Sequence, residues 1–144
     1  MFNSYLSVMR QYATFTGRAS RKEFWLYTLV VFLLSVVAEV LDMLLFGGQV
    51  FTADGMVAVE SYGILTGIVH LIHIVPSIAV GVRRLHDIDR TGWWLLLVFT
   101  GIGMLVILIF NVLSGTRGPN RFGPDPLGYP TPSFPTPGSI SPGR

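Results

Sequence analysis

Length, composition and charge limit the class of protein to which this chain can belong. Its 144 residues, enough for one domain, are 51% hydrophobic and only 12% charged, and the mean hydropathy is +0.59. A soluble domain carries roughly 25% charged residues, so the composition predicts a membrane protein. The chain has no cysteine, which excludes a disulfide framework, a thiolate nucleophile and a cysteine metal site. The net charge of +2 comes from a few clustered arginines, which favour contact with anionic lipid headgroups over nucleic acid.

The first fifteen residues predict an amphipathic helix. One apolar stripe at helical spacing runs through Phe2, Tyr5, Leu6, Met9, Tyr12 and Ala13. Residues 2–15 are too few to cross a bilayer, which takes about 20 residues. We therefore expect the helix either to lie on the inner leaflet or to fold under the transmembrane helices, and the sequence favours neither arrangement.

Three apolar runs then predict three transmembrane helices, at about residues 24–46, 62–82 and 92–113. The first is roughly 34 Å long at about 1.5 Å per residue, against a hydrocarbon core of about 30 Å. Ser20 and Glu23 match a capping box that begins this helix. Residues 47–61 are expected to form a loop. The pair Gly101-x-Gly103 is interpreted as a packing or kink feature inside the third helix.

The composition changes near the end of the third apolar run. Eight of the nine prolines lie after residue 113, mixed with glycine, serine and threonine. Such a segment buries too little apolar surface to order itself, so residues 128–144 are predicted to be a disordered tail after one integral membrane domain, residues 1–127. The predicted fold class is an all-α polytopic membrane protein with three transmembrane helices, an N-terminal amphipathic helix and a disordered proline-rich C-terminal tail.

Lysine and arginine choose the orientation, because they accumulate in cytoplasmic loops. Four precede the first predicted span and three lie between the second and third, namely Arg10, Arg18, Arg21 and Lys22, then Arg83, Arg84 and Arg90. Residues 47–61 contain none. The N-terminus and the second loop are therefore predicted to be cytoplasmic. Three spans place the tail outside, which Arg117 and Arg121 mildly contradict; a tail on the inside requires a re-entrant segment or an inverted topology.

Four motifs occur in a fixed order at the ends of the predicted spans. They are Gly17-Arg18-Ala19-Ser20-Arg21-Lys22-Glu23-Phe24-Trp25, Arg83-Arg84-Leu85-His86-Asp87, Thr91-Gly92-Trp93-Trp94 and Asn120-Arg121-Phe122-Gly123-Pro124-Asp125-Pro126. In these motifs the chain resembles the domain-of-unknown-function family 805, the YhaH/YhaI-like small bacterial inner-membrane proteins, over about residues 1–127. The resemblance implies a bacterial inner-membrane location and an integral fold of a few helices. It implies no activity, and the pair His70/His73 is not a recognised family feature.

Polar residues of these motifs form the first candidate site. They are Arg18, Arg21, Glu23, Arg83, Arg84, His86, Asp87, Trp93, Trp94, Asn120 and Asp125. Arg83 and Arg84 lie four and three residues before Asp87, so both can pair with it on a helix. The favoured interpretation is a set of interlocked ion pairs that fixes the loop and anchors it at anionic headgroups. The alternative is a cytoplasmic site for a phosphate-bearing ligand or a partner.

A second candidate cluster is predicted inside the membrane and consists of Glu39, Asp42, His70 and His73. Each pair is three residues apart and so shares a helix face. These groups could bind a divalent metal or relay protons. The favoured interpretation is that each is hydrogen-bonded for packing, so neither a metal nor a cofactor is expected.

The sequence has no His-Glu-x-x-His, Walker or nucleophile-elbow motif. We therefore expect a non-enzymatic accessory or scaffolding component that acts by association, with the lipid bilayer and either a membrane-protein partner or a second copy as partners and no nucleic acid. The alternative is a small homo-oligomeric transporter or ion-pathway component that uses Glu39/Asp42 and His70/His73. An intramembrane metalloenzyme built on the same four residues is a distant third.

Overall fold

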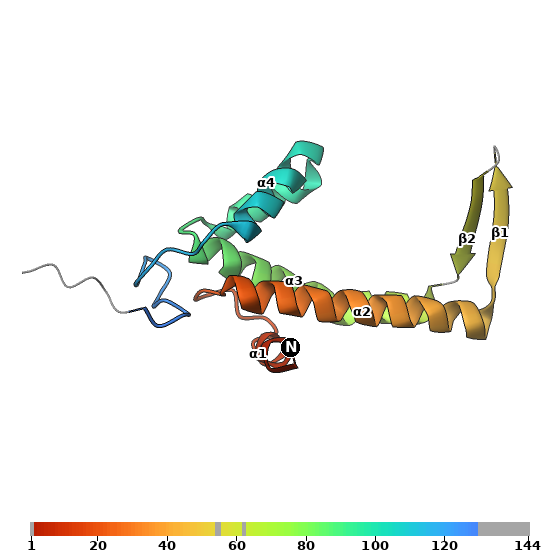
Figure 1. Ribbon diagram of the computed structural model, residues 1–144, viewed down its shortest axis with the longest axis horizontal. Coiled ribbons are helices and arrows are strands. Elements are labelled where there is room, and N and C mark those ends of the chain that lie inside the picture. The colour runs from red at the N-terminus through yellow and green to blue at the C-terminus, as the bar shows by residue number, and fades with distance from the viewer. Residues whose placement is uncertain (1, 54–55, 62, 130–144) are drawn as a thin grey trace, which may run out of the picture.

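The structure is a computed structural model that describes residues 2–53, 56–61 and 63–129 (Figure 1). Its elements, in chain order, are α1 (Phe2–Arg10), α2 (Arg21–Phe46), β1 (Gly48–Ala53), β2 (Met56–Ser61), α3 (Ile64–Asp87), the 3-10 helix η1 (Gly92–Phe99) and α4 (Gly101–Val112). Figure 1 shows α2 and α3 side by side as an antiparallel pair, with α1 on one side and the η1/α4 segment on the other. Most of the tail predicted for residues 128–144 lies outside the described residues.

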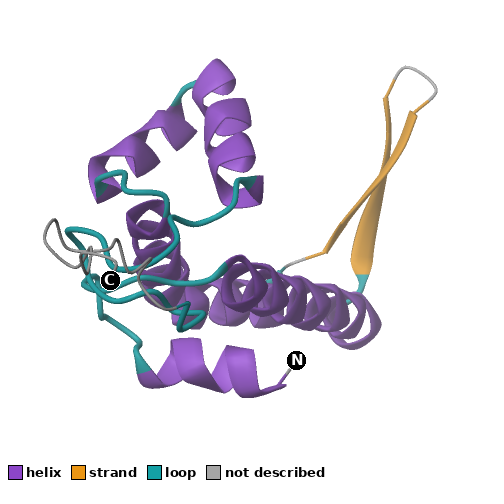
Figure 2. Ribbon diagram, turned by 60° about the vertical axis from the view of Figure 1, so that its left-hand side comes forward, coloured by secondary structure: helices purple, strands orange, loops and turns teal. Residues whose placement is uncertain are grey.

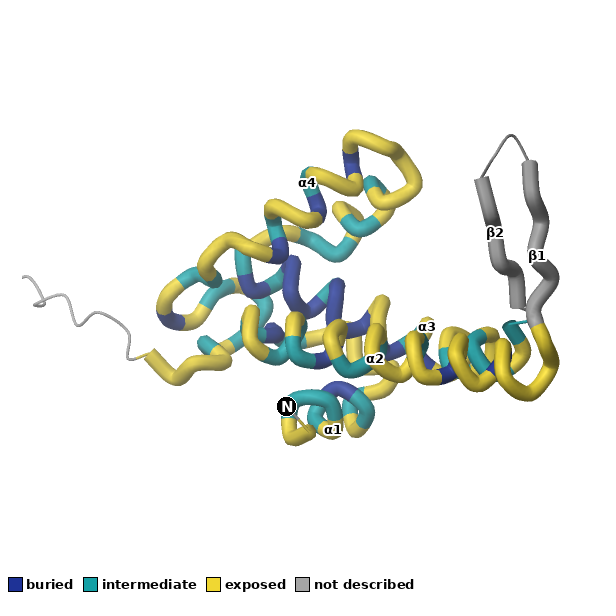
Figure 3. The backbone as a smooth tube through the Cα atoms, turned by 45° about the vertical axis from the view of Figure 1, so that its right-hand side comes forward, coloured by how far each residue is buried: buried dark blue, intermediate teal, exposed yellow. Residues whose placement is uncertain are grey.

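Helices α2 and α3 confirm, by length and composition, two of the predicted spans. At about 1.5 Å per residue their 26 and 24 residues reach about 39 Å and 36 Å, more than the roughly 30 Å of a bilayer core. The core helix of a soluble protein would be mostly buried. In an apolar stretch of 18 residues, however, only 11% of α2 and 28% of α3 is buried. Figure 3 shows that much of this helix pair is exposed, and the side chains of Phe32, Leu44 and Leu71 are 61%, 75% and 73% exposed. Such a continuous apolar surface suits lipid rather than water.

The third predicted span, residues 92–113, is not confirmed, because the structure has two shorter helices there instead of one. The segment breaks at Thr100, whose backbone is extended at φ −110° and ψ 137°. There the Thr100 hydroxyl accepts a hydrogen bond from the N–H of Gly103 at 3.1 Å and begins a new helix. A Cβ at position 103 would collide with the carbonyl oxygen of Leu97, so the turn requires glycine there.

The two halves of this segment form a helical hairpin. Figure 2 shows η1 and α4 folded back on each other. Eight residues of 3-10 helix reach about 16 Å and twelve of α-helix about 18 Å, so neither spans a bilayer core of about 30 Å. Both ends of the hairpin return to the last turns of α3: Gly92 packs against Val82, and the Leu113 carbonyl accepts from Arg84.

Residues 47–61 are also more ordered than the predicted loop. Strands β1 and β2 pair antiparallel from Gly48 opposite Ser61 to Ala53 opposite Met56, and Figure 1 shows the β-hairpin standing away from the helices. The sequence between the strands is Asp54-Gly55, a dipeptide that favours two-residue hairpin turns. The all-α class therefore needs one correction, because a β-hairpin joins the two long helices.

Helix α1 is shorter than the predicted 2–15 and packs against the bundle. It ends at Arg10, and its Val8 is fully buried in a small core with Ala19, Tyr27 and Val80. Of the two arrangements left open by the sequence, the structure has the helix folded against α2 and α3. Its Phe2 side chain remains 75% exposed.

Candidate functional site

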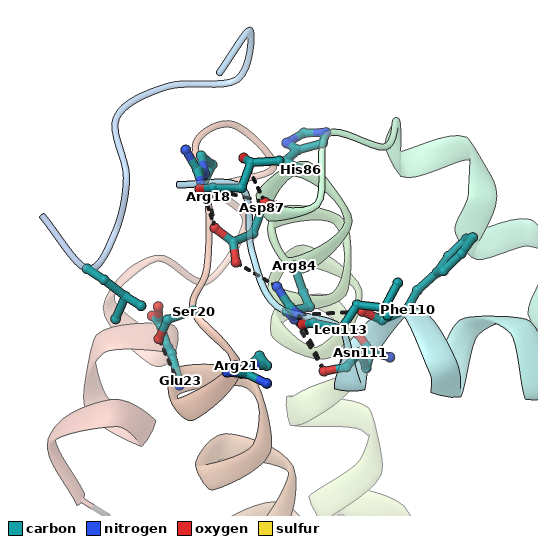
Figure 4. Close-up of polar contacts among 12 residues, drawn as sticks. Arg18, Ser20, Arg21, Glu23, Arg84, His86, Asp87, Phe110, Asn111 and Leu113 are labelled. Atoms are coloured by element: carbon teal, nitrogen blue, oxygen red, sulfur yellow. Dashed lines mark hydrogen bonds and ion pairs between the residues drawn. The ribbon is translucent and has the colours of Figure 1, made fainter. Parts of the chain in front are cut away.

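A buried ion-pair network lies where α2 begins and α3 ends (Figure 4). Its centre is the Asp87 carboxylate, with Arg18 Nη2 at 2.9 Å from Oδ1 and Arg84 Nη1 at 2.6 Å from Oδ2. The side chains of Arg18, Arg84 and Asp87 are 1%, 0% and 5% exposed. The predicted Arg84–Asp87 pair is confirmed, and the predicted Arg83–Asp87 pair is not formed.

The same two arginines bind backbone carbonyls on the segment that follows the helical hairpin. Arg18 donates to the carbonyl oxygens of Thr116 at 2.5 Å and Gly118 at 2.6 Å. Arg84 donates to Leu113 and, at 3.4 Å, to Asn111. Charge-assisted hydrogen bonds of this kind are about twice as strong as neutral ones. The network therefore joins three segments far apart in sequence: the chain before α2, the end of α3 and the chain after α4.

Arg83 belongs to a second, smaller group that fastens α1. Its Nη1 donates to Gln11 Oε1 at 2.8 Å and lies 3.6 Å from Glu23 Oε1, which also accepts from the Ser7 hydroxyl at 3.0 Å. The predicted cap is confirmed in half: the Ser20 hydroxyl accepts from the Glu23 N–H at 3.2 Å, while the Glu23 carboxylate turns to Ser7 and Arg83. Two further Arg83 nitrogens, Nε and Nη2, have no hydrogen-bond partner in the described part of the chain.

The last motif folds over the end of α3 as a compact turn. Asn120 Nδ2 donates to the His86 carbonyl at 2.9 Å, and the Phe122 ring stacks on the His86 ring with centroids 3.9 Å apart. Asp125 accepts from the N–H groups of Leu127 and Gly118, both at 2.9 Å. These two donors lower the pKa of the Asp125 carboxyl from its ordinary value.

Some of the motif residues also line an open cleft of about 460 Å³, here called the Trp93 cleft. Its wall includes His86, Thr91, Gly92, Trp93 and Phe122 from three of the four motifs. Trp93 is 78% exposed. Its neighbour Trp94 instead packs edge-on against Phe110, with Arg90 over its ring at 5.6 Å. The two tryptophans of the motif therefore serve different surfaces.

The four predicted intramembrane residues do not come together as one cluster. Asp42 accepts from the N–H groups of Leu65 and Thr66 at 2.8 and 2.9 Å and so caps the first turn of α3. Glu39 accepts from the Thr66 hydroxyl at 3.2 Å.

The two histidines of α3 form separate contacts, one with α2 and one with α1. His70 Nε2 pairs with the Ser35 hydroxyl at 3.1 Å, and His73 Nε2 with the Tyr5 hydroxyl at 2.9 Å. Across residues 2–53, 56–61 and 63–129, no three His, Cys, Asp or Glu side chains are grouped closely enough to hold a metal ion. The contacts match the hydrogen-bonded packing that the sequence favours.

Several contributors to the site were not predicted from the sequence. Ser7 on α1 and Gln11 just after it contact the group around Arg83, and Asn111, Leu113, Thr116 and Gly118 contribute carbonyl oxygens to the network. A carbonyl acceptor has no side-chain signature, so no residue pattern marks it. Phe122 could have been chosen from the sequence, because it lies inside the last of the four motifs.

Comparison with known proteins identifies the family. The model of the family described as "Protein of unknown function (DUF805)" matches residues 12–124. Inner membrane protein YhaH of Escherichia coli K12 is 44% identical over 123 residues, covering 85% of this chain and 94% of its own length. Inner membrane protein YhaI of the same strain is 39% identical, covering 85% and 93%. No solved structure matches with significance.

These findings agree with the apolar spans of the structure, and the family description and the relatives' names give no sign of an enzymatic activity. The chain is a bacterial inner-membrane protein, and it belongs to the DUF805 family of proteins of unknown function.

Proposed function

We propose that this inner-membrane protein acts by association rather than catalysis, and that a partner membrane protein docks on the Trp93 cleft. The observation that carries the proposal is the division of the motif residues into two sets. One set is buried inside the protein, where its side chains form the ion-pair network. The other lines an open cleft beside a largely exposed tryptophan.

The buried set is poorly suited to chemistry. A general base needs a free lone pair facing its substrate, but each oxygen of Asp87 is held by a guanidinium group at hydrogen-bond distance. Arg18 and Arg84 likewise donate their N–H groups to Asp87 and to backbone carbonyls. These contacts support a positioning role, in which the network holds the walls of the cleft in place.

The exposed set has the character of an interaction surface. Trp is enriched among residues that dominate binding energy, because a large ring fills a pocket at small entropic cost. Trp93 stands beside a wall formed by the stacked pair His86 and Phe122, whose rings are parallel within 3°. A rigid aromatic wall next to an exposed aromatic anchor suits a helix or loop of another membrane protein.

We also propose the membrane topology that this role requires. Helices α2 and α3 cross the bilayer, the η1/α4 hairpin enters from the cytoplasmic side and returns, and the β-hairpin lies outside. An even number of crossings places the N-terminus and residues 114–144 together on the cytoplasmic side. This arrangement removes the conflict between three spans and the basic residues Arg117 and Arg121.

Site-specific photocrosslinking in intact cells tests the association. A photoreactive phenylalanine derivative at Leu96, which lines the cleft, should give one defined heteromeric adduct, identified by mass spectrometry. The adduct should be lost when Trp93→Ala is added and kept with Trp94→Ala, because Trp94 faces Phe110 instead. The matched control places the probe at Leu29, which is 40% exposed on α2. The same adducts from both positions, or none from Leu96, would contradict the proposal.

A second candidate function is supported by the α2/α3 interface. Polar contacts recur along it, from Asp42 with Thr66 through Ser35 with His70 to Tyr27 with Ser77 at 3.1 Å. Polar groups at membrane depth are typical of ion and proton pathways. A homo-oligomeric ion-pathway component is therefore the alternative, and an adduct at twice the mass of the chain in the same crosslinking experiment would favour it.

A further inference from the structure

A cavity of about 310 Å³ lies at the start of α2, between that helix and the segment after α4. It is distinct from the Trp93 cleft, with which it shares no lining residue. Three basic side chains line it: Arg21 and Lys22 from the first turn of α2, and Arg117 from the segment after α4. The volume is in the range of small-ligand sites, about 300–1,000 Å³.

The positive charge of this cavity is only partly compensated by the protein. Lys22 and Arg117 have no hydrogen bond or ion pair in the described part of the chain. Arg21 donates to the Val112 carbonyl, which carries no formal charge. Two carboxylates also line the cavity. Asp87 is paired with Arg18 and Arg84, which lie outside the lining, so Asp125 is the one carboxylate left to oppose the three basic side chains of the described lining.

The surroundings of the cavity favour a lipid over a soluble anion. It sits where the apolar run of α2 begins, the level at which phospholipid phosphates meet a span. Its lining includes the exposed apolar side chains Leu127 and Tyr129, at 62% and 54% exposure. Ser20 adds a hydroxyl group to the lining, whereas the Thr116 hydroxyl is already bonded to the Asp87 carbonyl and to Asn120.

We propose that this cavity binds the phosphodiester headgroup of an anionic phospholipid, with Lys22 and Arg117 as its principal contacts. The N-terminus of α2 adds to the attraction, since the positive end of a helix favours phosphate. The acyl chains then lie against the apolar outer surface of the spans. This site does not depend on a protein partner at the Trp93 cleft.

Native mass spectrometry of the detergent-purified full chain tests the site. Dioleoyl phosphatidylglycerol is titrated into the protein, with dioleoyl phosphatidylcholine as the zwitterionic comparison of equal chain length. The variant Lys22→Gln/Arg117→Gln removes two charged side chains that form no hydrogen bond or ion pair in the described part of the chain, so it should fold normally. The control Arg10→Gln/Arg90→Gln removes the same charge from exposed positions outside the cavity.

We expect one tightly retained phosphatidylglycerol, bound about 30-fold more weakly by the cavity variant and unchanged in the control. Excess inorganic phosphate should not displace it. Equal weakening in both variants would overturn the proposal, because it would show diffuse charge attraction. Retention of phosphatidylcholine as tightly as phosphatidylglycerol, or displacement by inorganic phosphate, would overturn it as well.

Discussion

Asp87 is the residue of the network whose side chain and backbone are both most tightly held by neighbouring groups. It is 4% exposed and holds two buried guanidinium groups, while its backbone carbonyl accepts from the Thr116 N–H at 2.8 Å. Gly115 passes so close that any Cβ there would collide with the Asp87 carboxylate. The sequence could predict the Arg84 pair from its spacing, but Arg18 lies 69 residues away from Asp87 and no local pattern indicates that contact.

The Asp87→Asn variant should be strongly destabilised, because it leaves two buried arginines without a counterion. Breaking a buried ion pair on one side costs about 3–5 kcal/mol of unfolding free energy. The matched control is Asp89→Asn, which removes an exposed pair with Arg121 whose side chains are 58% and 47% exposed. Exposed pairs contribute about 0–1 kcal/mol. Thermal unfolding in detergent measures both; equal midpoints for the two variants would contradict a central role for Asp87.

At the scale of elements, the apolar pattern predicts the long helices well and fails at the third. The predicted ranges 24–46 and 62–82 fall close to α2 and α3. A run of apolar residues over 92–113 is equally compatible with one span or two short helices. Hydropathy measures side-chain polarity and does not indicate where the backbone changes direction. The informative residues were Thr100, Gly101 and Gly103, which cap and turn the chain. In the same way, Asp54-Gly55 between β-prone runs indicated the β-hairpin, which was predicted as a loop.

Substitution of the two glycines after Thr100 separates a required turn from an ordinary helix start. Gly103→Ala places a Cβ against the Leu97 carbonyl and the Thr100 hydroxyl, so it should cost about 1–3 kcal/mol. Gly101→Ala meets nothing within 4 Å and should change stability by less than about 1 kcal/mol. Circular dichroism during thermal unfolding compares them. A neutral Gly103→Ala would indicate that the segment does not turn at Thr100.

For the whole molecule, the motifs gather at one end. The ion-pair network, the Trp93 cleft and the basic cavity all lie where α2 begins and α3 ends, while the β-hairpin stands at the opposite end (Figures 1 and 4). Basic residues mark the first end and are missing from 47–61. The charge pattern predicts that the N-terminus and the loop after α3 share the cytoplasmic side, and the re-entrant hairpin that we propose would place the C-terminal segment there as well.

The central proposal is that the chain crosses the membrane twice and that residues 92–113 enter and return. Paired fusions of a fluorescent protein and of alkaline phosphatase after Arg144 test it most directly, since the first is active inside and the second outside. We predict a fluorescent, phosphatase-inactive fusion at Arg144, with the opposite result for fusions placed between β1 and β2. An active phosphatase after Arg144 would contradict two crossings and restore a third span.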